Sequence, residues 1–327
     1  MSAATAVAGM RVVEWVGSGR ARVAEHPLPV QALGEDEVEG PTLVSLVSPG
    51  TELQSFLRDD PKPRGSGYAS VFRIARRGAA VTGLAEGQAV FAMGRHASFQ
   101  RFKARDVVAL PDGLAPETAV FCRLMGVSWT TLVTTAARPA DRVLVTGLGI
   151  VGHLAAQNFK AAGYRVTAVD PVAWRRERAQ RAGIADVLAQ APAPEPDGTF
   201  ALAVECSGHE DAVLSACRAV RKGGEVVLVG VPWQRRSEAS AHALLDLVFH
   251  RYVRLRSGWE WELPHHPQAF GRGSIFDSFR GALHWLHEGR VQVAGLSRTF
   301  APEQAQEALS GLAGRDAEHL TALFEWR

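Results

Sequence analysis

A glycine-rich turn at residues 146–152 has the spacing GxGxxG. It follows an apolar, strand-like run and opens a helix expected over 151–162, and this context gives the spacing its meaning. Gly147 permits a tight turn, Gly149 lets the backbone approach a pyrophosphate, and Gly152 lets helix and strand pack closely. The helix N-terminus adds free N–H groups and a positive dipole end. Three glycines that only shape an ordinary tight turn are the less favoured alternative. The expected dinucleotide-binding residues here are Gly147, Leu148, Gly149, Ile150, Val151 and Gly152.

An acidic residue, Asp170, ends the next expected strand at 165–169. A carboxylate at this place bonds the adenosine ribose 2′-OH and repels a 2′-phosphate, which favours NAD(H) over NADP(H). A helix N-cap for the segment after Pro171 is the alternative role. Arg175 and Arg176 could hold a 2′-phosphate, so NADP(H) stays open as the weaker prediction. We count Arg175 among the cofactor-binding residues.

Two later segments belong to the same expected site. Val204-Glu-Cys-Ser-Gly208 ends one strand, and Lys222-Gly-Gly-Glu-Val226 enters the next, which Gly230 leaves. Open α/β sheets bind ligands at the carboxyl ends of their strands. We therefore expect Cys206, Ser207 and Gly230 to line the cofactor site.

The elements around these motifs fall into two patterns. Short β segments punctuated by glycine and proline fill the first third, as is typical of a β-barrel or sandwich. From residue 141 onward, strands alternate with helices, which predicts a doubly wound parallel sheet. A strand at 252–257 could extend that sheet, and the loop 190–198 interrupts it. The predicted domains are a β-rich catalytic domain, 1–125 with 266–327, and a Rossmann-type dinucleotide-binding domain, 126–265.

Bulk properties limit the classes of partner. The 327 residues are 46% hydrophobic and 21% charged, with a net charge of +2, so we expect a small-molecule substrate and no nucleic acid. No apolar run reaches membrane-spanning length, and the first ten residues lack the pattern of a signal peptide. Three cysteines without a CxxC pair favour a reducing cytoplasm.

With these motifs in place, the chain resembles the medium-chain dehydrogenase/reductases, the alcohol dehydrogenase superfamily, over nearly its whole length. Leu110-Pro-Asp-Gly113 joins the glycine motifs in carrying the resemblance. Ser48-Pro-Gly-Thr-Glu52, Gly67-Tyr-Ala-Ser70 and His96-Ala97 are similar to the zinc-free branch typified by bacteriochlorophyllide 2-hydroxyethyl dehydrogenase. The resemblance implies a Rossmann-type doubly wound sheet plus a β-rich GroES-like catalytic domain.

The zinc ligands of the superfamily are missing from this chain. No cysteine precedes Cys122, Tyr68 stands where a histidine would, and Leu124 stands at the third ligand position. Cys122 lies two helix positions away from that third site. Catalytic zinc needs three protein ligands and an open position, so we predict no zinc and no other metal.

Hydride chemistry without zinc needs other groups to stabilise or protonate the substrate oxygen. Thr51 matches the relay hydroxyl of the superfamily, Tyr68 offers a phenol, and His96 suits acid–base work. Glu52 could orient Thr51 or a nearby donor. The catalytic candidates are therefore Thr51, Tyr68, His96 and Glu52. Each also has a structural interpretation: a helix cap, a packed aromatic, a satisfied histidine or a salt bridge. Arg123 is a weaker candidate.

The aromatic, histidine-rich segment 258–266 is expected to be a substrate loop, since family members close this region over the substrate. His265 and His266 are adjacent on a loop without a carboxylate set, so they are more typical of a surface than of a metal site. Residues 252–257 are where many family members pair as dimers, which favours a homodimer. Arg254 and Arg256 could equally guard an unpaired edge.

The leading hypothesis is a zinc-independent, NAD(H)-dependent oxidoreductase. It would interconvert a secondary alcohol and a ketone on a small polar or ring-bearing metabolite of a biosynthetic pathway. The alternatives are a reductase of an activated C=C bond, as in the enone and quinone reductases, and a non-catalytic dinucleotide-binding sensor. Asp170 argues against the reductase, which would favour NADPH.

Overall fold

The computed structural model describes residues 9–59, 64–193, 198–314 and 318–326. Its contacts divide the chain into a first unit, residues 1–123 with 293–327, and a second unit, residues 124–292. None of the helices in the described ranges combines the length and apolar character needed to cross a membrane.

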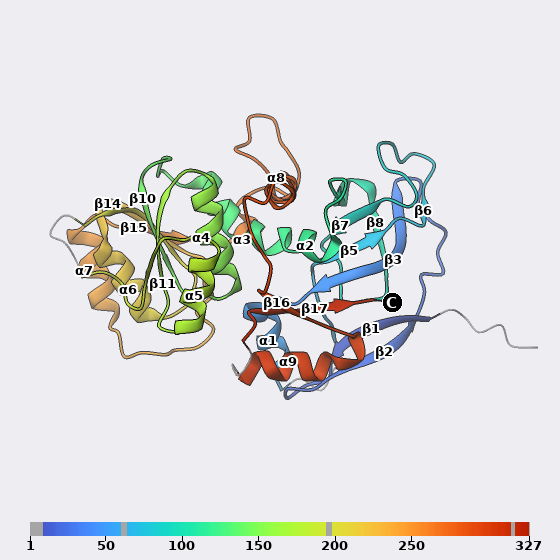
Figure 1. The fold of residues 1–327 in the computed structure, drawn as a ribbon, viewed down its shortest axis with the longest axis horizontal. Helices are drawn as coiled ribbons and strands as arrows, with labels where there is room; N and C mark the ends of the chain where they lie inside the picture. Colours follow the sequence, from blue (N-terminus) through green and yellow to red (C-terminus); the bar gives the residue numbers. More distant parts are fainter. Residues whose placement is uncertain (1–8, 60–63, 194–197, 315–317, 327) are drawn as a thin grey trace, which may run out of the picture. The chain divides into compact units, whose positions relative to one another are not determined.

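A sheet of six parallel strands forms the centre of the second unit (Figure 1). Its strands are β10 (Arg142–Thr146), β11 (Arg165–Val169), β12 (Asp186–Leu188), β13 (Phe200–Glu205), β14 (Val220–Leu228) and β15 (Arg254–Ser257). They lie in the order β12-β11-β10-β13-β14-β15. From β10 the chain adds β11 and β12 toward one edge of the sheet, and it then returns to the other side of β10 to add β13, β14 and β15. Ligands of such sheets bind at the carboxyl ends beside this reversal. The predicted doubly wound sheet is confirmed.

Helices cover both faces of this sheet because its central strand is apolar on both. Val143 and Val145 pack into one core with Ala155, while Leu144 between them packs into another with Ala216. Alternate residues of a strand point to opposite faces, so both faces need covering. The helices are α3 (Cys122–Thr134), α4 (Ile150–Ala161), α5 (Ala173–Arg181), α6 (Glu210–Ala219), α7 (Ala241–His250), η2 (Glu260–Glu262) and α8 (Ile275–His287).

The contact division differs from the predicted domain boundary at residue 266. Helix α8 falls in the second unit, whereas the sequence placed residues 266–292 in the β-rich domain. Its Trp285 ring lies 4.3 Å from the Trp129 ring of α3, and a Cβ on Gly281 would lie 2.6 Å from Trp129. This packing ties α8 to α3. Two short elements, β12 and α7, were not predicted.

The first unit is β-rich, as predicted. Its strands are β1 (Gly9–Trp15), β2 (Ala21–Pro27), β3 (Glu37–Leu46), β4 (Arg64–Gly65), β5 (Ser70–Arg73), β6 (Arg76–Arg77), β7 (Ala89–Ala92), β8 (Phe99–Lys103), β9 (Val107–Ala109), β16 (Ser297–Phe300) and β17 (Thr321–Glu325). Its helices are α1 (Pro49–Leu57), η1 (Ala104–Asp106), α2 (Pro116–Ala119), η3 (Pro302–Gln304) and α9 (Ala305–Gly314). Ten-residue β3 is central, because it pairs with β5, β6 and β8 and also with the C-terminal strand β17.

Candidate functional site

The glycine turn between β10 and α4 leaves no room for side chains at two of its positions. Gly147 has a φ of 82°, and a Cβ there would lie 2.9 Å from Cβ of Ser207. A Cβ on Gly152 would lie 1.7 Å from the carbonyl oxygen of Gly147. Both contacts are too close for real atoms, so the turn and the helix after it can pack this way only with glycine.

The third glycine, Gly149, faces open space instead. It is the N-cap residue of α4, no side chain caps that helix, and a Cβ there would meet no described atom within 4 Å. Backbone N–H groups at such a helix start suit an anion. The side chains of Leu148 and Ile150 are buried and Val151 is half-buried, so these residues can offer a ligand mainly their backbone. The turn therefore fits a pyrophosphate.

Asp170 is buried beside this turn, with only 2% of its surface exposed. One carboxylate oxygen accepts a hydrogen bond from the backbone N–H of Leu148 at 2.7 Å, and the other accepts one from Val172 at 2.8 Å. The N-cap of α5 is Val172, so Asp170 is not the cap. A carboxylate offers about four acceptor positions, so these two backbone donors leave part of its acceptor capacity unused.

The two arginines after Asp170 have different surroundings. Arg176 donates to the carbonyl oxygens of Asp170 and Pro171, both at 2.8 Å. The Arg175 guanidinium lies 3.6 Å from the Asp170 carboxylate and 5.3 Å from the centre of the Trp174 ring. Arg175 is therefore the arginine that partly offsets the charge of Asp170.

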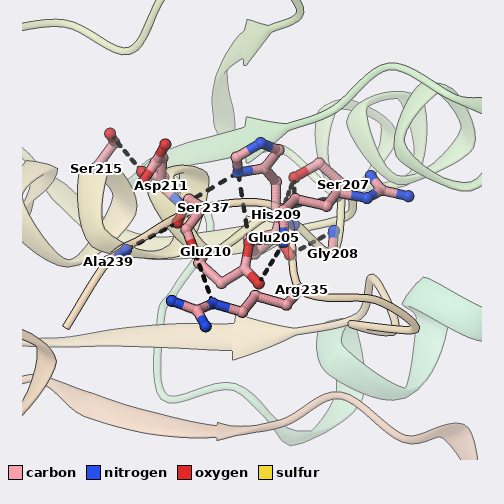
Figure 2. Close-up of polar contacts among 11 residues, drawn as sticks. Glu205, Ser207, Gly208, His209, Glu210, Asp211, Ser215, Arg235, Ser237 and Ala239 are labelled. Carbon is pink, nitrogen blue, oxygen red and sulfur yellow. Dashed lines mark hydrogen bonds and ion pairs between the residues drawn. The ribbon is translucent and has the colours of Figure 1, made fainter. Parts of the chain in front are cut away.

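Glu205, at the carboxyl end of β13, holds the neighbouring loop (Figure 2). Its buried carboxylate accepts hydrogen bonds from the N–H and hydroxyl of Ser207 and from the N–H of Gly208. Thr146 of β10 donates a further one at 3.3 Å. Burial raises the pKa of Glu205, although these donors act in the opposite direction. Sequence reasoning left Glu205 out of the site; its signal was an acid that closes an apolar strand.

The other residues predicted from these strand ends lie around the same loop. A Cβ on Gly152 would lie 3.1 Å from Cβ of Cys206, and one on Gly230 would lie 2.3 Å from the nitrogen of Gly208. Burial raises the pKa of the Cys206 thiol well above its ordinary value, so this cysteine is a packed thiol and not a thiolate. The structure thus brings Cys206, Ser207 and Gly230 beside the glycine turn.

Two of the predicted catalytic candidates, Thr51 and Tyr68, lie close together in the first unit. Their hydroxyl oxygens are 3.5 Å apart, and the Arg123 guanidinium lies 4.5 Å from the centre of the Tyr68 ring. Burial raises the pKa of Tyr68, the charge of Arg123 lowers it, and Glu52 raises it again; the net direction is upward. The phenol therefore keeps its proton at neutral pH and acts as a hydrogen-bond donor.

His96 and Glu52 form a buried pair instead of lining an open site. His96 is 0% exposed, and its Nε2 lies 3.0 Å from the Glu52 carboxylate. Its Nδ1 lies 2.8 Å from the hydroxyl of Ser45, so both ring nitrogens are occupied. Direct contact between His96 and a substrate, which the sequence suggested, does not fit this burial. Ser45 was not singled out from the sequence.

The donor set in this unit does not fit a catalytic zinc. Across the described part of the chain, no three His, Cys, Asp or Glu side chains gather as a metal site. Glu52 and His96 satisfy each other, and Leu124 is apolar. Cys122 is fully buried, which raises the pKa of its thiol well above the ordinary value.

The predicted substrate loop uses its histidines for ring packing. His265 stacks on Trp261 with centroids 5.1 Å apart, and His266 stacks on Phe276 at 4.7 Å. Trp259 remains 68% exposed. The structure gives an aromatic surface here, built from stacked histidine, tryptophan and phenylalanine rings.

Comparisons with known proteins point in one direction. A family model described as zinc-binding dehydrogenase matches residues 151–257, which lie in the second unit. An uncharacterised zinc-type alcohol dehydrogenase-like protein of Escherichia coli K12, YphC, is 30% identical over 203 residues, 58% of this chain and 56% of that protein. An alcohol dehydrogenase of Geobacillus stearothermophilus is 36% identical over 152 residues, 42% of this chain and 43% of that protein. The chain thus spans about half the length of the curated relatives it matches.

Among solved structures, galactitol-1-phosphate dehydrogenase from Escherichia coli has a similar fold. The TM-score is 0.80 at 18% identity, and the match covers 96% of this chain and 99% of that one. At this identity the likeness concerns the fold alone.

Proposed function

We propose that the chain is an NAD(H)-dependent oxidoreductase of the medium-chain dehydrogenase/reductase superfamily that works without zinc. Its reaction would interconvert a secondary alcohol and a ketone. The substrate would be a small polar or ring-bearing metabolite of a biosynthetic pathway. The observation that carries this proposal is the pair of hydroxyls, Thr51 and Tyr68, set beside the Arg123 guanidinium.

The dinucleotide would be held by the second unit. Backbone N–H groups at the start of α4 would bind its pyrophosphate, with Gly149 leaving room for close approach. Asp170 would accept hydrogen bonds from the adenosine ribose. When bound, the nicotinamide supplies or accepts the hydride.

The first unit would handle the proton. In the reducing direction, the Tyr68 phenol donates a hydrogen bond to the carbonyl oxygen and gives up its proton as the carbon receives hydride. An alkoxide is more basic than a phenolate, so the transfer is downhill. Thr51, 3.5 Å away and exposed, can pass a replacement proton from water to Tyr68. The Arg123 charge stabilises the transient phenolate.

Binding measurements test the cofactor and metal proposals directly. We expect NADH to bind more tightly than NADPH in a fluorescence titration, and the reverse order would contradict the role of Asp170. We expect elemental analysis to find no stoichiometric zinc in the active protein. A screen of alcohols and ketones at the nicotinamide absorbance then tests the reaction, with no turnover favouring the sensor alternative.

A reductase of activated C=C bonds differs from this proposal in its product and cofactor. It would consume enones or quinones with NADPH, so these compounds belong in the same screen. The burial of Asp170 against the glycine turn favours NAD(H) and the alcohol reaction.

We further propose a cytoplasmic homodimer. The three cysteines are free thiols, which suits a reducing compartment. Within the described residues, strand β15 ends the sheet and pairs with β14 alone, and Leu245, Phe249 and Tyr252 before it are exposed. An exposed edge with apolar neighbours suits a second copy. Light scattering across protein concentrations should give a dimer mass, and a concentration-independent monomer would contradict this.

A further inference from the structure

Four segments of the first unit meet in one buried chain of hydrogen bonds. The chain runs from Trp326, after β17, through Ser45 of β3 and His96, after β7, to Glu52 of α1. Trp326 Nε1 lies 2.9 Å from the Ser45 hydroxyl, which lies 2.8 Å from His96 Nδ1. His96 Nε2 lies 3.0 Å from the Glu52 carboxylate. All four residues are at most 6% exposed.

The chemistry of its two ends fixes the direction of the two terminal hydrogen bonds. An indole N–H can only donate, and a carboxylate can only accept. Trp326 therefore donates to the Ser45 hydroxyl, and His96 Nε2–H donates to Glu52. Between them, the Ser45 hydroxyl and His96 Nδ1 share the middle hydrogen bond. The other Glu52 oxygen accepts the backbone N–H of Ser48 at 2.7 Å, which closes the first turn of α1.

His96 also touches the segment that carries the phenol. Its backbone N–H donates to the carbonyl oxygen of Ser66 at 2.8 Å. A Cβ on Gly67 would lie 2.7 Å from Cγ of the His96 ring, so the ring lies directly against this glycine, which has a φ of 87°. His96 thus contacts the neighbour of Thr51 on one side and the neighbour of Tyr68 on the other.

We propose that His96, through this chain, is the positioning residue that holds Thr51 and Tyr68 together, and that the chain extends this control to the C-terminal Trp326. A metal would tie such segments together by its ligands; here buried hydrogen bonds do so. The catalytic consequence rests on the proposed function, but the positioning itself does not. A displaced donor costs catalysis heavily, because a misplacement of 1 Å can lower the rate about 10²-fold.

The Tyr68 phenol reports this positioning without any substrate. The protein has three tyrosines, so ring-labelled tyrosine gives three NMR signals that Tyr→Phe variants can assign. In the unaltered protein, Tyr68 should ionise above its ordinary pKa near 10. His96→Phe removes the donor to Glu52 and loosens both turns. We expect the Tyr68 signal and its pKa to move away from their values in the unaltered protein, while His96→Gln, which can both donate and accept, restores part of the shift.

A matched control exists in the same unit. His26 contacts Glu14 at 2.8 Å with the same atom types, but its side chain is 42% exposed and lies on the β1–β2 hairpin. His26→Phe should leave the Tyr68 signal unchanged. If His96→Phe does not fold, Trp326→Phe is measured in its place. This substitution keeps an aromatic ring and removes only the indole N–H that begins the chain of hydrogen bonds. It should shift Tyr68 in the same direction, by less.

An unchanged Tyr68 signal in a folded His96→Phe protein, or in Trp326→Phe where the former does not fold, overturns the proposal. A shift that His26→Phe reproduces also overturns it. Where a substrate is known, kcat of His96→Phe should fall about 10²-fold with KM little changed. A Tyr68 shift without any dehydrogenase activity would leave the positioning standing and reject the proposed function.

Discussion

The two turns that carry the proposed chemistry are stabilised in different ways, one by its backbone and the other by buried side chains. The turn at residues 147–152 takes its shape from backbone, because Gly147 and Gly152 leave no space for a Cβ. The first turn of α1, residues 48–52, takes its shape from buried side chains, since Glu52 is fixed by His96 from another part of the chain. One turn requires that Gly147 and Gly152 carry no side chain, and the other requires a side chain 44 positions away in sequence.

This difference has consequences for substitution. A backbone-built turn fails sterically as soon as an atom is added. A turn held by a polar chain fails when a donor is removed and a buried carboxylate loses its partner, which is costly in a low-dielectric interior. The predictions that follow use this contrast, beginning with the largest effect.

The three glycines of the backbone-built turn should separate folding from binding. Gly152→Ala places a Cβ 1.7 Å from a carbonyl oxygen, so we expect it to lower the free energy of unfolding by about 3 kcal/mol and to abolish NADH binding. Gly149→Ala meets no protein atom, so stability should stay within about 0.5 kcal/mol while NADH affinity falls about tenfold. Urea unfolding and fluorescence titration measure the two quantities.

Gly311→Ala in α9 is the control, because a Cβ there also meets nothing within 4 Å and no ligand is proposed nearby. It should leave NADH affinity unchanged. Equal losses of affinity in Gly149→Ala and Gly311→Ala would contradict a pyrophosphate at the turn.

The phenol beside the side-chain-built turn, Tyr68, should be needed for catalysis and not for stability. Tyr68→Phe should lower kcat by about 10²- to 10⁴-fold and leave unfolding nearly unchanged, since the ring and its contact with Arg123 remain. Ketone reduction needs the protonated phenol, so activity should fall as pH rises through the raised pKa of Tyr68, above its ordinary value near 10. A full pH–rate profile measures this limit. A variant that kept wild-type kcat would remove Tyr68 from the site.

The same contrast explains what the sequence could predict. The glycine turn, Asp170 and the strand ends around Cys206 are local patterns, because glycine spacing and an acid after an apolar run reflect nearby backbone geometry. The doubly wound parallel sheet followed from strand and helix alternation. These predictions concern contacts whose physical cause lies within a few residues.

The chain of hydrogen bonds that links Trp326 to Glu52 could not be predicted in this way. Ser45, His96 and Trp326 lie far apart in sequence, and their types are common in cores and on surfaces alike. His96 was predicted as a candidate for acid–base work, but its burial depends on how β3 and β17 pair. The sequence could not assign α8 to the second unit for the same reason, because that assignment depends on the contact between the Trp129 and Trp285 rings, far apart in sequence.

Cofactor preference should change moderately when the side chain beside the glycine turn changes. Asp170→Asn removes the negative charge and one acceptor oxygen, so the ratio of NADPH to NADH affinity should rise about tenfold. Arg175→Ala should move the ratio the other way, because the guanidinium 3.6 Å from Asp170 no longer offsets its charge. Parallel titrations with both cofactors give the ratios. Shifts of the same sign in both variants would show that Arg175 does not act through Asp170.

The smallest expected effect concerns Glu205, whose carboxylate holds the loop beside the backbone-built turn. The folded pKa of Glu205 is raised by burial, so its contribution to stability is fully present below the unfolded pKa and is lost as pH rises through the folded value. Glu225 on the adjacent strand provides the opposite case. Burial acts to raise its pKa, but hydrogen bonds from Thr135 and Arg256 outweigh burial and lower it. Its contribution is therefore present above the unfolded pKa and is lost as pH falls through the folded value.

Urea unfolding at a series of pH values should resolve this pair. Relative to the unaltered protein, Glu205→Gln should remove a decrease in stability with rising pH, and Glu225→Gln should remove an increase. If both substitutions changed the pH dependence with the same sign, burial would not dominate at Glu205. The loop at Ser207 and Gly208 would then be held by an ionised carboxylate whose hydrogen bonds outweigh its desolvation. In that case the backbone-built turn would depend on a buried charge in the same way as the turn that carries Thr51.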